Sequence, residues 1–264
     1  MAGGADGASG ADVAAGADAA GGAHVSGGDP PPGDAVGTGV AGATGSGVAG
    51  AVPPAVEAGT GFGRLGADLV VGDDGLARCG WAGTDPLYCA YHDDDWGRPL
   101  HDERALFELL TLEAFQSGLS WLTILRKRPA FREAFDGFDP EVVAAYGDAE
   151  VERLMGDAGI VRNRAKVEAT IANARAVVAL HEAGKTFTDL VWSHAPEPGT
   201  ADRPPVGTRF ASLAEIPSAT PASKAMAKDL RASGFRFVGP TVAYAYMQSA
   251  GLVDDHLIGC HVTT

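Results

Sequence analysis

Large apolar and basic side chains are nearly absent from the first 72 residues of this 264-residue chain. Ala, Gly, Pro, Val and Asp dominate this segment, and no Lys or Arg precedes Arg64. Such a composition buries too little apolar surface to offset the entropy lost on ordering. The sequence therefore predicts a disordered tail over residues 1–73 and one folded domain over residues 74–264.

Long apolar runs and cysteines are also scarce. No run of about 18 apolar residues occurs, and the N-terminus lacks the basic and Leu-rich parts of a signal peptide. We therefore expect no membrane partner. The three cysteines are Cys79, Cys89 and Cys260. Such a low, odd count argues against a disulfide framework and predicts a reducing, cytoplasmic location.

Positive charge is in deficit, with 20 Lys and Arg against 34 Asp and Glu and a formal net charge of −14. Taken alone, this balance argues against a nucleic-acid partner. Any contact with DNA would need a local basic patch.

Aromatic side chains make up only 7% of the sequence, but they are concentrated in residues 78–97. This stretch contains Trp81, Tyr88, Tyr91 and Trp96, together with two cysteines and a histidine. Aromatic rings offer flat apolar faces with polar edges. The stretch therefore predicts a pocket for a planar ligand, fastened by a metal.

Apolar residues recur at helical spacing through most of the remaining chain, and no sustained two-residue alternation appears. The fold class predicted is all-α. The expected helices cover residues 102–112, 121–127, 129–135, 139–145, 148–155, 163–182, 220–232 and 240–250. Residues 194–208, rich in Pro and Gly, predict a surface loop.

Four residues at the two ends of the domain have the chemistry of zinc ligands. Cys79 and His92 lie near its start, and His256 and Cys260 lie at its end. Four N and S ligands make a closed, structural zinc site. The spacing alone leaves open a buried thiol with two surface histidines, and also His261 in place of His256. Cys89 is expected to be a small core residue.

Glu113 follows an apolar helical face, and Trp121 comes eight residues later. The carboxylate could be a solvated helix end or a buried, directed acceptor. The segment 157–166 joins two expected helices and contains Gly159, Arg162, Arg164 and Lys166. Its N–H groups and basic side chains suit a DNA phosphate, although an ordinary turn with solvated bases is an open alternative.

Six motifs together resemble the 3-methyladenine DNA glycosylase I family. They are Arg-Cys-Gly-Trp (78–81), Asp-Pro-Leu-Tyr-x-Ala-Tyr-His-Asp-x-x-Trp-Gly (85–97), Leu-Glu-x-x-Gln-x-Gly-Leu-Ser-Trp (112–121), Asp-Ala-Gly-Ile-x-Arg (157–162), Gly-Phe-x-Phe-Val-Gly (234–239) and Gly-Leu-Val-x-Asp-His-x-x-Gly-Cys (251–260). The resemblance covers residues 77–261. The first 72 residues have no counterpart in it.

The resemblance implies an all-α helix-hairpin-helix glycosylase fold, with the hairpin at about 148–175 gripping the DNA backbone. It implies one structural Zn²⁺ per chain, held by Cys79, His92, His256 and Cys260. It further implies that Glu113 and Tyr91 hydrogen-bond the excised base and that Trp121 stacks on it. Three other side chains would complete the aromatic pocket, namely Trp81, Tyr88 and Trp96.

The function expected is hydrolysis of the N-glycosidic bond of 3-methyladenine in double-stranded alkylated DNA. The free base would be the product, an abasic site would remain, and the enzyme would act as a monomer. The pocket motifs contain no Lys, which argues against a Schiff-base lyase step. One alternative is a zinc-stabilised module that binds a modified base or nucleotide without catalysis. Another is a structural interaction protein whose aromatic stretch is only core.

Overall fold

The computed structural model describes residues 68–204 and 207–262. All described residues belong to one compact unit, which lies within Gly59–Thr264. The predicted disorder of residues 1–67 lies outside the described residues and stays a prediction. Strand β1 (Leu69–Val71) precedes residue 74, so the predicted start of the folded domain was too late.

The described residues form one small sheet and nine α-helices. After β1 come β2 (Ala77–Cys79), a 3-10 turn (Gly80–Ala82), α1 (Pro86–Ala90), a π-helical turn (Tyr91–Asp95), α2 (Glu103–Gln116), α3 (Trp121–Ala134), α4 (Pro140–Ala144), α5 (Asp148–Gly156), α6 (Arg164–Glu182), α7 (Phe187–Trp192), α8 (Pro221–Ala232) and α9 (Pro240–Ser249). Helices dominate, as the sequence predicts.

The sequence did not predict the one small sheet, in which β1 and β2 pair in antiparallel fashion, with Leu69 opposite Cys79. Three-residue strands are too short to show an alternating pattern in sequence. The pairing places Cys79 at the end of β2, where its position is fixed by backbone hydrogen bonds.

Helix α2 begins as the sequence predicts and ends later. The Asp102 side chain accepts a hydrogen bond from the Ala105 N–H group and caps the helix. The helix continues to Gln116, and residues 106–115 are all buried. Glu113 is therefore inside a buried helix and does not follow its end.

Helix α3 is continuous, whereas the sequence predicts two helices separated near Pro129. Ser120 caps the helix by accepting a hydrogen bond from the Thr123 N–H group. A proline inside a helix removes one backbone hydrogen bond. Buried side chains on both sides of Pro129, among them Leu125 and Phe131, keep the helix in one piece.

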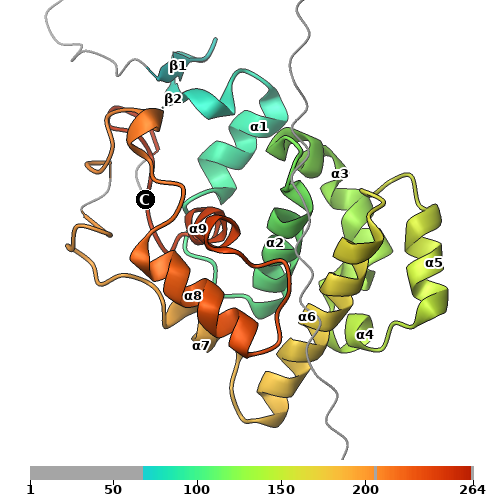
Figure 1. The fold of residues 1–264 in the computed structure, drawn as a ribbon. Coiled ribbons are helices and arrows are strands. Elements are labelled where there is room, and N and C mark those ends of the chain that lie inside the picture. The colour runs from blue at the N-terminus through green and yellow to red at the C-terminus, as the bar shows by residue number, and fades with distance from the viewer. Residues whose placement is uncertain (1–67, 205–206, 263–264) are drawn as a thin grey trace, which may run out of the picture. The chain divides into compact units, whose positions relative to one another are not determined.

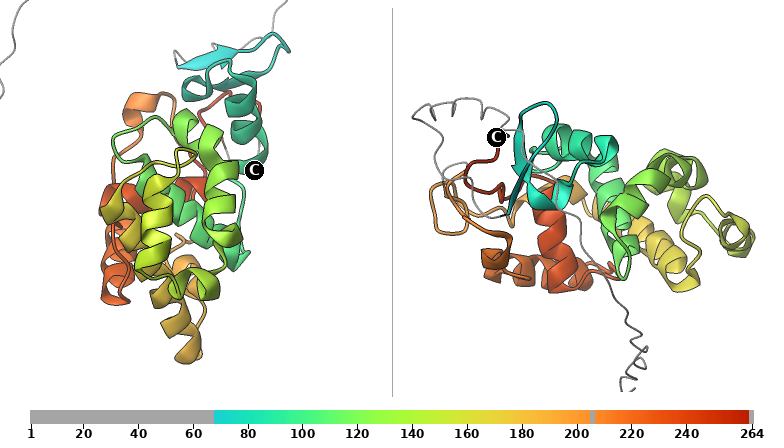
Figure 2. Two further views of the ribbon diagram at one scale, coloured as in Figure 1. Left: turned by 90° about the vertical axis from the view of Figure 1, so that its right-hand side faces the viewer. Right: turned by 90° about the horizontal axis from the view of Figure 1, so that it is seen from above.

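The core is built where α9 packs against α2 and α8, and where α6 packs against α2, α4 and α5 (Figure 1). Figure 2 shows the C-terminal segment returning to the small sheet, where the His261 N–H group donates to the Ala77 carbonyl. The fold thus joins the two ends of the described domain. No helix among the described residues is long and apolar enough to cross a membrane.

Candidate functional site

A cavity of about 310 Å³ opens between α9, the C-terminal half of α2, the start of α3 and the aromatic stretch. All six residues predicted to contact a base line it. They are Trp81, Tyr88, Tyr91, Trp96, Glu113 and Trp121. The fold therefore brings together residues that are up to 40 positions apart in the sequence.

The aromatic walls of the cavity have defined local causes. Trp121 is the first residue of α3, which begins after a turn with Gly118 at φ +86°. Tyr91 begins the π-helical turn, and Trp96 follows its end. The Tyr91 and Trp121 ring centroids are 5.4 Å apart, and those of Trp81 and Trp96 are 4.9 Å apart. All four side chains line the cavity, so its wall is largely aromatic.

Glu113 is a buried carboxyl group directed at this cavity, with a relative exposure of only 4%. Burial disfavours its charged form and raises its pKa to about 7, although a hydrogen bond from Ser249 opposes the rise. The Ser249 hydroxyl donates to Glu113 Oε1 at 2.6 Å. The carboxyl group can therefore change its protonation state near neutral pH.

Two other polar groups in the cavity wall have no partner among the described residues. They are the buried Tyr91 hydroxyl and the buried Trp121 indole N–H group. Buried polar groups are nearly always hydrogen-bonded, so these two unpartnered groups on residues of the cavity wall are candidates for contact with a ligand or water. The cavity thus combines aromatic walls with one buried carboxyl group and two polar groups that lack a partner.

Sequence reasoning missed the contribution of α9 to the cavity. Ala245, Gln248 and Ser249 line it, together with Leu213 and Ile216. The three α9 residues share one helical face, but nothing in their types distinguishes that face from an ordinary core stripe. Only the packing of α9 against α2 places Ser249 beside Glu113.

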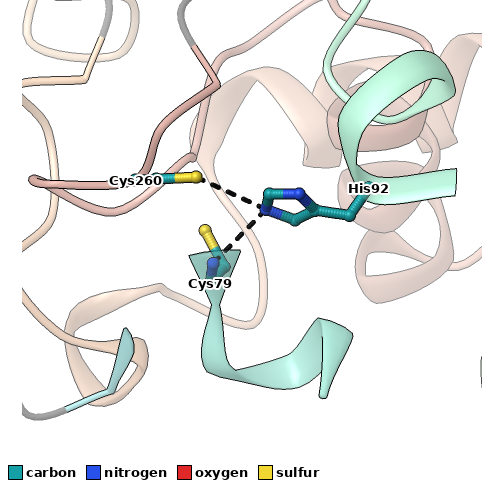
Figure 3. Close-up of side chains that lie close together, drawn as sticks. All are labelled: Cys79, His92 and Cys260. Atoms are coloured by element: carbon teal, nitrogen blue, oxygen red, sulfur yellow. Dashed lines mark hydrogen bonds between the residues drawn. The ribbon is translucent and has the colours of Figure 1, made fainter. Parts of the chain in front are cut away.

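A second cluster forms where Cys79 and His92 of the aromatic stretch meet Cys260 of the C-terminal segment (Figure 3). Their ligand atoms all lie within 4.8 Å of one another. Cys260 Sγ is 3.5 Å from His92 Nε2. The structure thus brings together three of the four predicted ligands, from both ends of the domain.

Each histidine uses Nδ1 for a neighbouring carboxylate, which leaves Nε2 on the other side of the ring; His92 Nε2 accepts a hydrogen bond from the Cys79 N–H group at 3.3 Å. His92 Nδ1 donates to Asp93 Oδ1 and His256 Nδ1 donates to Asp254 Oδ1, each at 2.8 Å. A carboxylate on one ring nitrogen is the usual support of a metal-bound histidine. His256 is fully buried, its ring centroid lies 5.0 Å from that of His92, and its Nε2 has no partner.

Cys79, His92 and Cys260 supply donor types that suit a tetrahedral zinc ion, whereas His256 lies outside their group of ligand atoms within 4.8 Å of one another. Zn–S bonds of about 2.3 Å and Zn–N bonds of about 2.0 Å place neighbouring S and N ligands about 3.5 Å apart. That value matches the distance between Cys260 Sγ and His92 Nε2. The alternative ligand, His261, directs its Nε2 at Asp93 Oδ1 over 2.9 Å. The unpartnered Nε2 of His256 favours His256 as the fourth ligand.

The predicted DNA-backbone residues lie in the turn between α5 and α6, residues 157–163, and in the first turn of α6. Arg162 is exposed, and its side chain has no partner within the described part of the chain. Arg164 forms an exposed ion pair with Glu152 at 2.7 Å. The Gly159 N–H group donates to Asp157 Oδ1 and is not free. Of these groups, Arg162 is the one most available to a phosphate.

The predicted phosphate contact of Lys166 was wrong. Its side chain is buried, and Nζ donates to the carbonyl groups of Phe115 at 2.9 Å and Ser117 at 3.0 Å. A cation is favoured at these carbonyls because they end helix α2. Burial also lowers the pKa of Lys166. The ammonium group is therefore used in hydrogen bonds within the protein and is not directed at a DNA phosphate.

The family follows from comparison with known proteins. A family model for methyladenine glycosylases matches residues 81–263. The chain belongs to this family. It is 48% identical to DNA-3-methyladenine glycosylase 1 of Escherichia coli over 185 residues, which cover 70% of this chain and 96% of that protein.

Solved structures of the family agree with this fold. The chain is similar to a crystal structure of 3-methyladenine DNA glycosylase I, with a TM-score of 0.65 and 49% identity over 70% of this chain and 98% of that one. A variant of 3-methyladenine DNA glycosylase I in complex with 3-methyladenine gives a TM-score of 0.64 and 36% identity, over 70% and 96% of the two chains.

Proposed function

We propose that this methyladenine glycosylase hydrolyses the N-glycosidic bond of 3-methyladenine in alkylated DNA. The products are the free base and an abasic site. The observation that carries the proposal is the buried carboxyl group of Glu113 in an aromatic cavity beside the unpartnered Tyr91 hydroxyl. A structural relative bound to 3-methyladenine supports the assignment.

The cavity suits a base that has been rotated out of the double helix. Enzymes that act on a base must extrude it and hold it by stacking and edge contacts. Trp121 stacks on the base, and Trp81, Tyr88 and Trp96 enclose it. The Glu113 carboxylate accepts a hydrogen bond from the exocyclic amine, and the Tyr91 hydroxyl bonds a second atom of the base edge.

Selectivity follows partly from the charge of the lesion. Methylation at N3 makes the nucleoside cationic and weakens its glycosidic bond. The faces of Trp121 and its neighbours attract a cation, and so does the ionised Glu113 carboxylate. Normal adenine is neutral and keeps a stable bond, so it gains less from the same site. Strong acid catalysis on the leaving base is unnecessary.

Water attacks the sugar carbon of an oxocarbenium-like species. Among the described residues that line the cavity there is no Lys, which fits hydrolysis without a Schiff-base step. Cys79, His92, His256 and Cys260 would hold one structural Zn²⁺, which fastens the aromatic stretch to the C-terminal segment.

Helices α5 and α6 with their turn form the proposed helix-hairpin-helix element, which grips the DNA backbone. Arg162→Ala should weaken binding of duplex DNA, because it removes one cation from the phosphate contact. A lost phosphate contact lowers the slope of log K against log salt by about 0.9. Titration at several salt concentrations measures this slope. A slope identical to that of the unmodified protein would contradict the contact.

The direct test is to incubate the protein with methylated DNA and identify the released bases chromatographically. The expected result is release of free 3-methyladenine with abasic sites left in the DNA. The alternative, a zinc-stabilised module that binds the modified base without catalysis, predicts saturable binding and no release. A monomeric state and a cytoplasmic location stay predictions.

A further inference from the structure

Two lysines connect the α5–α6 turn to the helices that carry the cavity residues. Lys127 lies in α3, six positions after Trp121, and reaches the turn. Lys166 lies at the start of α6, just after the turn, and reaches the end of α2. Neither contact is explained by the proposed chemistry, and together they join the turn to both helices.

Lys127 fixes the backbone orientation of the turn. Its Nζ donates to the carbonyl oxygens of Ala158 at 3.0 Å and Gly159 at 2.9 Å. In a trans peptide the carbonyl group and the following N–H group point in opposite directions. Holding the Gly159 carbonyl toward α3 therefore directs the N–H group of Ile160 away from α3. That N–H group has no partner among the described residues.

Lys166 joins the start of α6, which follows the turn, to the end of α2. Its Nζ bonds the carbonyls of Phe115 and Ser117, which lie two and four residues after Glu113. Helix α2 ends at Gln116, so this ammonium group satisfies carbonyls that the helix leaves unpaired. These bonds therefore set the position of the α6 start, and of the turn before it, relative to the end of the helix that carries Glu113.

We propose that Lys127 and Lys166 are positioning residues that set the placement of the DNA-backbone turn relative to the base cavity. The inference rests on the proposed function, because it presumes that the turn holds DNA while the cavity holds the extruded base. Misplacement by about 1 Å can cost about a hundredfold in rate. Lys127 donates hydrogen bonds from α3 to the turn, and Lys166 donates hydrogen bonds from the start of α6 to the end of α2. Together these bonds restrict both sliding and tilting of the turn.

The test uses Lys127→Met and Lys166→Met, which keep the aliphatic volume and remove the donors. Lys224→Met is the matched control, because Lys224 is exposed on α8. Three quantities are measured for each protein. They are the affinity for free 3-methyladenine by tryptophan fluorescence, the single-turnover excision rate at saturating DNA, and the salt dependence of DNA affinity.

The expected result for both variants is an excision rate about tenfold lower, with affinity for the free base changed less than twofold. The salt slope should stay unchanged, because neither lysine touches a phosphate. A parallel loss of free-base binding would mean a general structural role and would overturn the inference. So would a slope reduced by about 0.9, which indicates direct phosphate contact, or an unchanged excision rate.

The second variant and the control distinguish the possible outcomes. Lys127 is half-buried, so Lys127→Met still tests the proposal if the buried Lys166→Met variant does not fold. Failure of the proposed function looks different, because the unmodified protein and the Lys224→Met control would then also release no base.

Discussion

Replacing Glu113 by Gln should lower the single-turnover rate of 3-methyladenine excision by about 10- to 100-fold. Gln can still accept a hydrogen bond, but it lacks the charge that favours a cationic base. A hydrogen bond to a charged group contributes about 1.5–3 kcal/mol, and each 1.4 kcal/mol is a factor of ten. Rapid-quench assays on DNA that carries 3-methyladenine measure the rate, and an unchanged rate would exclude the role.

The same substitution should stabilise the protein at high pH. The Glu113 pKa of about 7 exceeds its ordinary value of 4.5, so the folded state binds the proton more tightly. Below pH 4.5 the carboxyl group is neutral in both states and folding carries no penalty. As the pH rises to 7 and above, the unfolded state ionises more readily and the wild type loses about 3 kcal/mol.

Gln never ionises, so the difference between the two proteins isolates this group. The free energy of unfolding of Glu113→Gln should exceed that of the wild type by about 2–3 kcal/mol at pH 8 and by nearly zero at pH 4.5. Urea titrations at both pH values measure it. The control Glu133→Gln, at an exposed position of α3, should show no such dependence. Equal free energies of unfolding of the two proteins at pH 8 would show that burial of the ionised Glu113 carboxylate does not destabilise the fold.

The ionisation of Glu113 should also make the rate of excision depend on pH. Because the carboxylate is the required acceptor, kcat/KM of the wild type should rise with pH and level off above about 7. Glu113→Gln should lack this rise. A wild-type profile that is flat between pH 5 and 8 would mean that the ionisation of Glu113 does not limit excision.

Replacing Cys260 by Ser should abolish stoichiometric zinc binding and lower the melting temperature by about 8–16 °C. A metal present at about 1,000 times its Kd stabilises the folded state by about 4 kcal/mol. Each kcal/mol corresponds to about 2–4 °C in a domain of this size. Elemental analysis and thermal denaturation measure the two effects, and a strong chelator should lower the melting temperature of the wild type similarly.

Cys89→Ser is the matched control for this experiment. Cys89 lies in the same aromatic stretch, but its Sγ donates to the Gly83 carbonyl at 3.6 Å and belongs to no metal cluster within the described residues. This variant should keep one zinc per chain. A Cys260→Ser protein with full metal content and an unchanged melting temperature would contradict the closed site.

The aromatic stretch is a part of the site that can be predicted from residues close together in the sequence. The residues that line the cavity are predictable there because Trp and Tyr are rare elsewhere and gather within 20 positions. The caps of α2 and α3 are equally predictable, because Asp102 and Ser120 act on N–H groups only three residues away. Such features depend on neighbours in the chain, so the sequence contains their whole cause.

The sequence by itself thus determined the helical class and the aromatic wall, and it supplied the residue types of the proposed metal site. Only the tertiary structure decided that Lys166 turns inward to α2, that α3 continues through Pro129, and that Ser249 meets Glu113. Each of these outcomes depends on what packs against the residue from a distant segment. From its position beside a basic turn, Lys166 is predicted to bind phosphate. The fold instead places the unpaired carbonyl groups at the end of α2 within hydrogen-bond distance of its ammonium group.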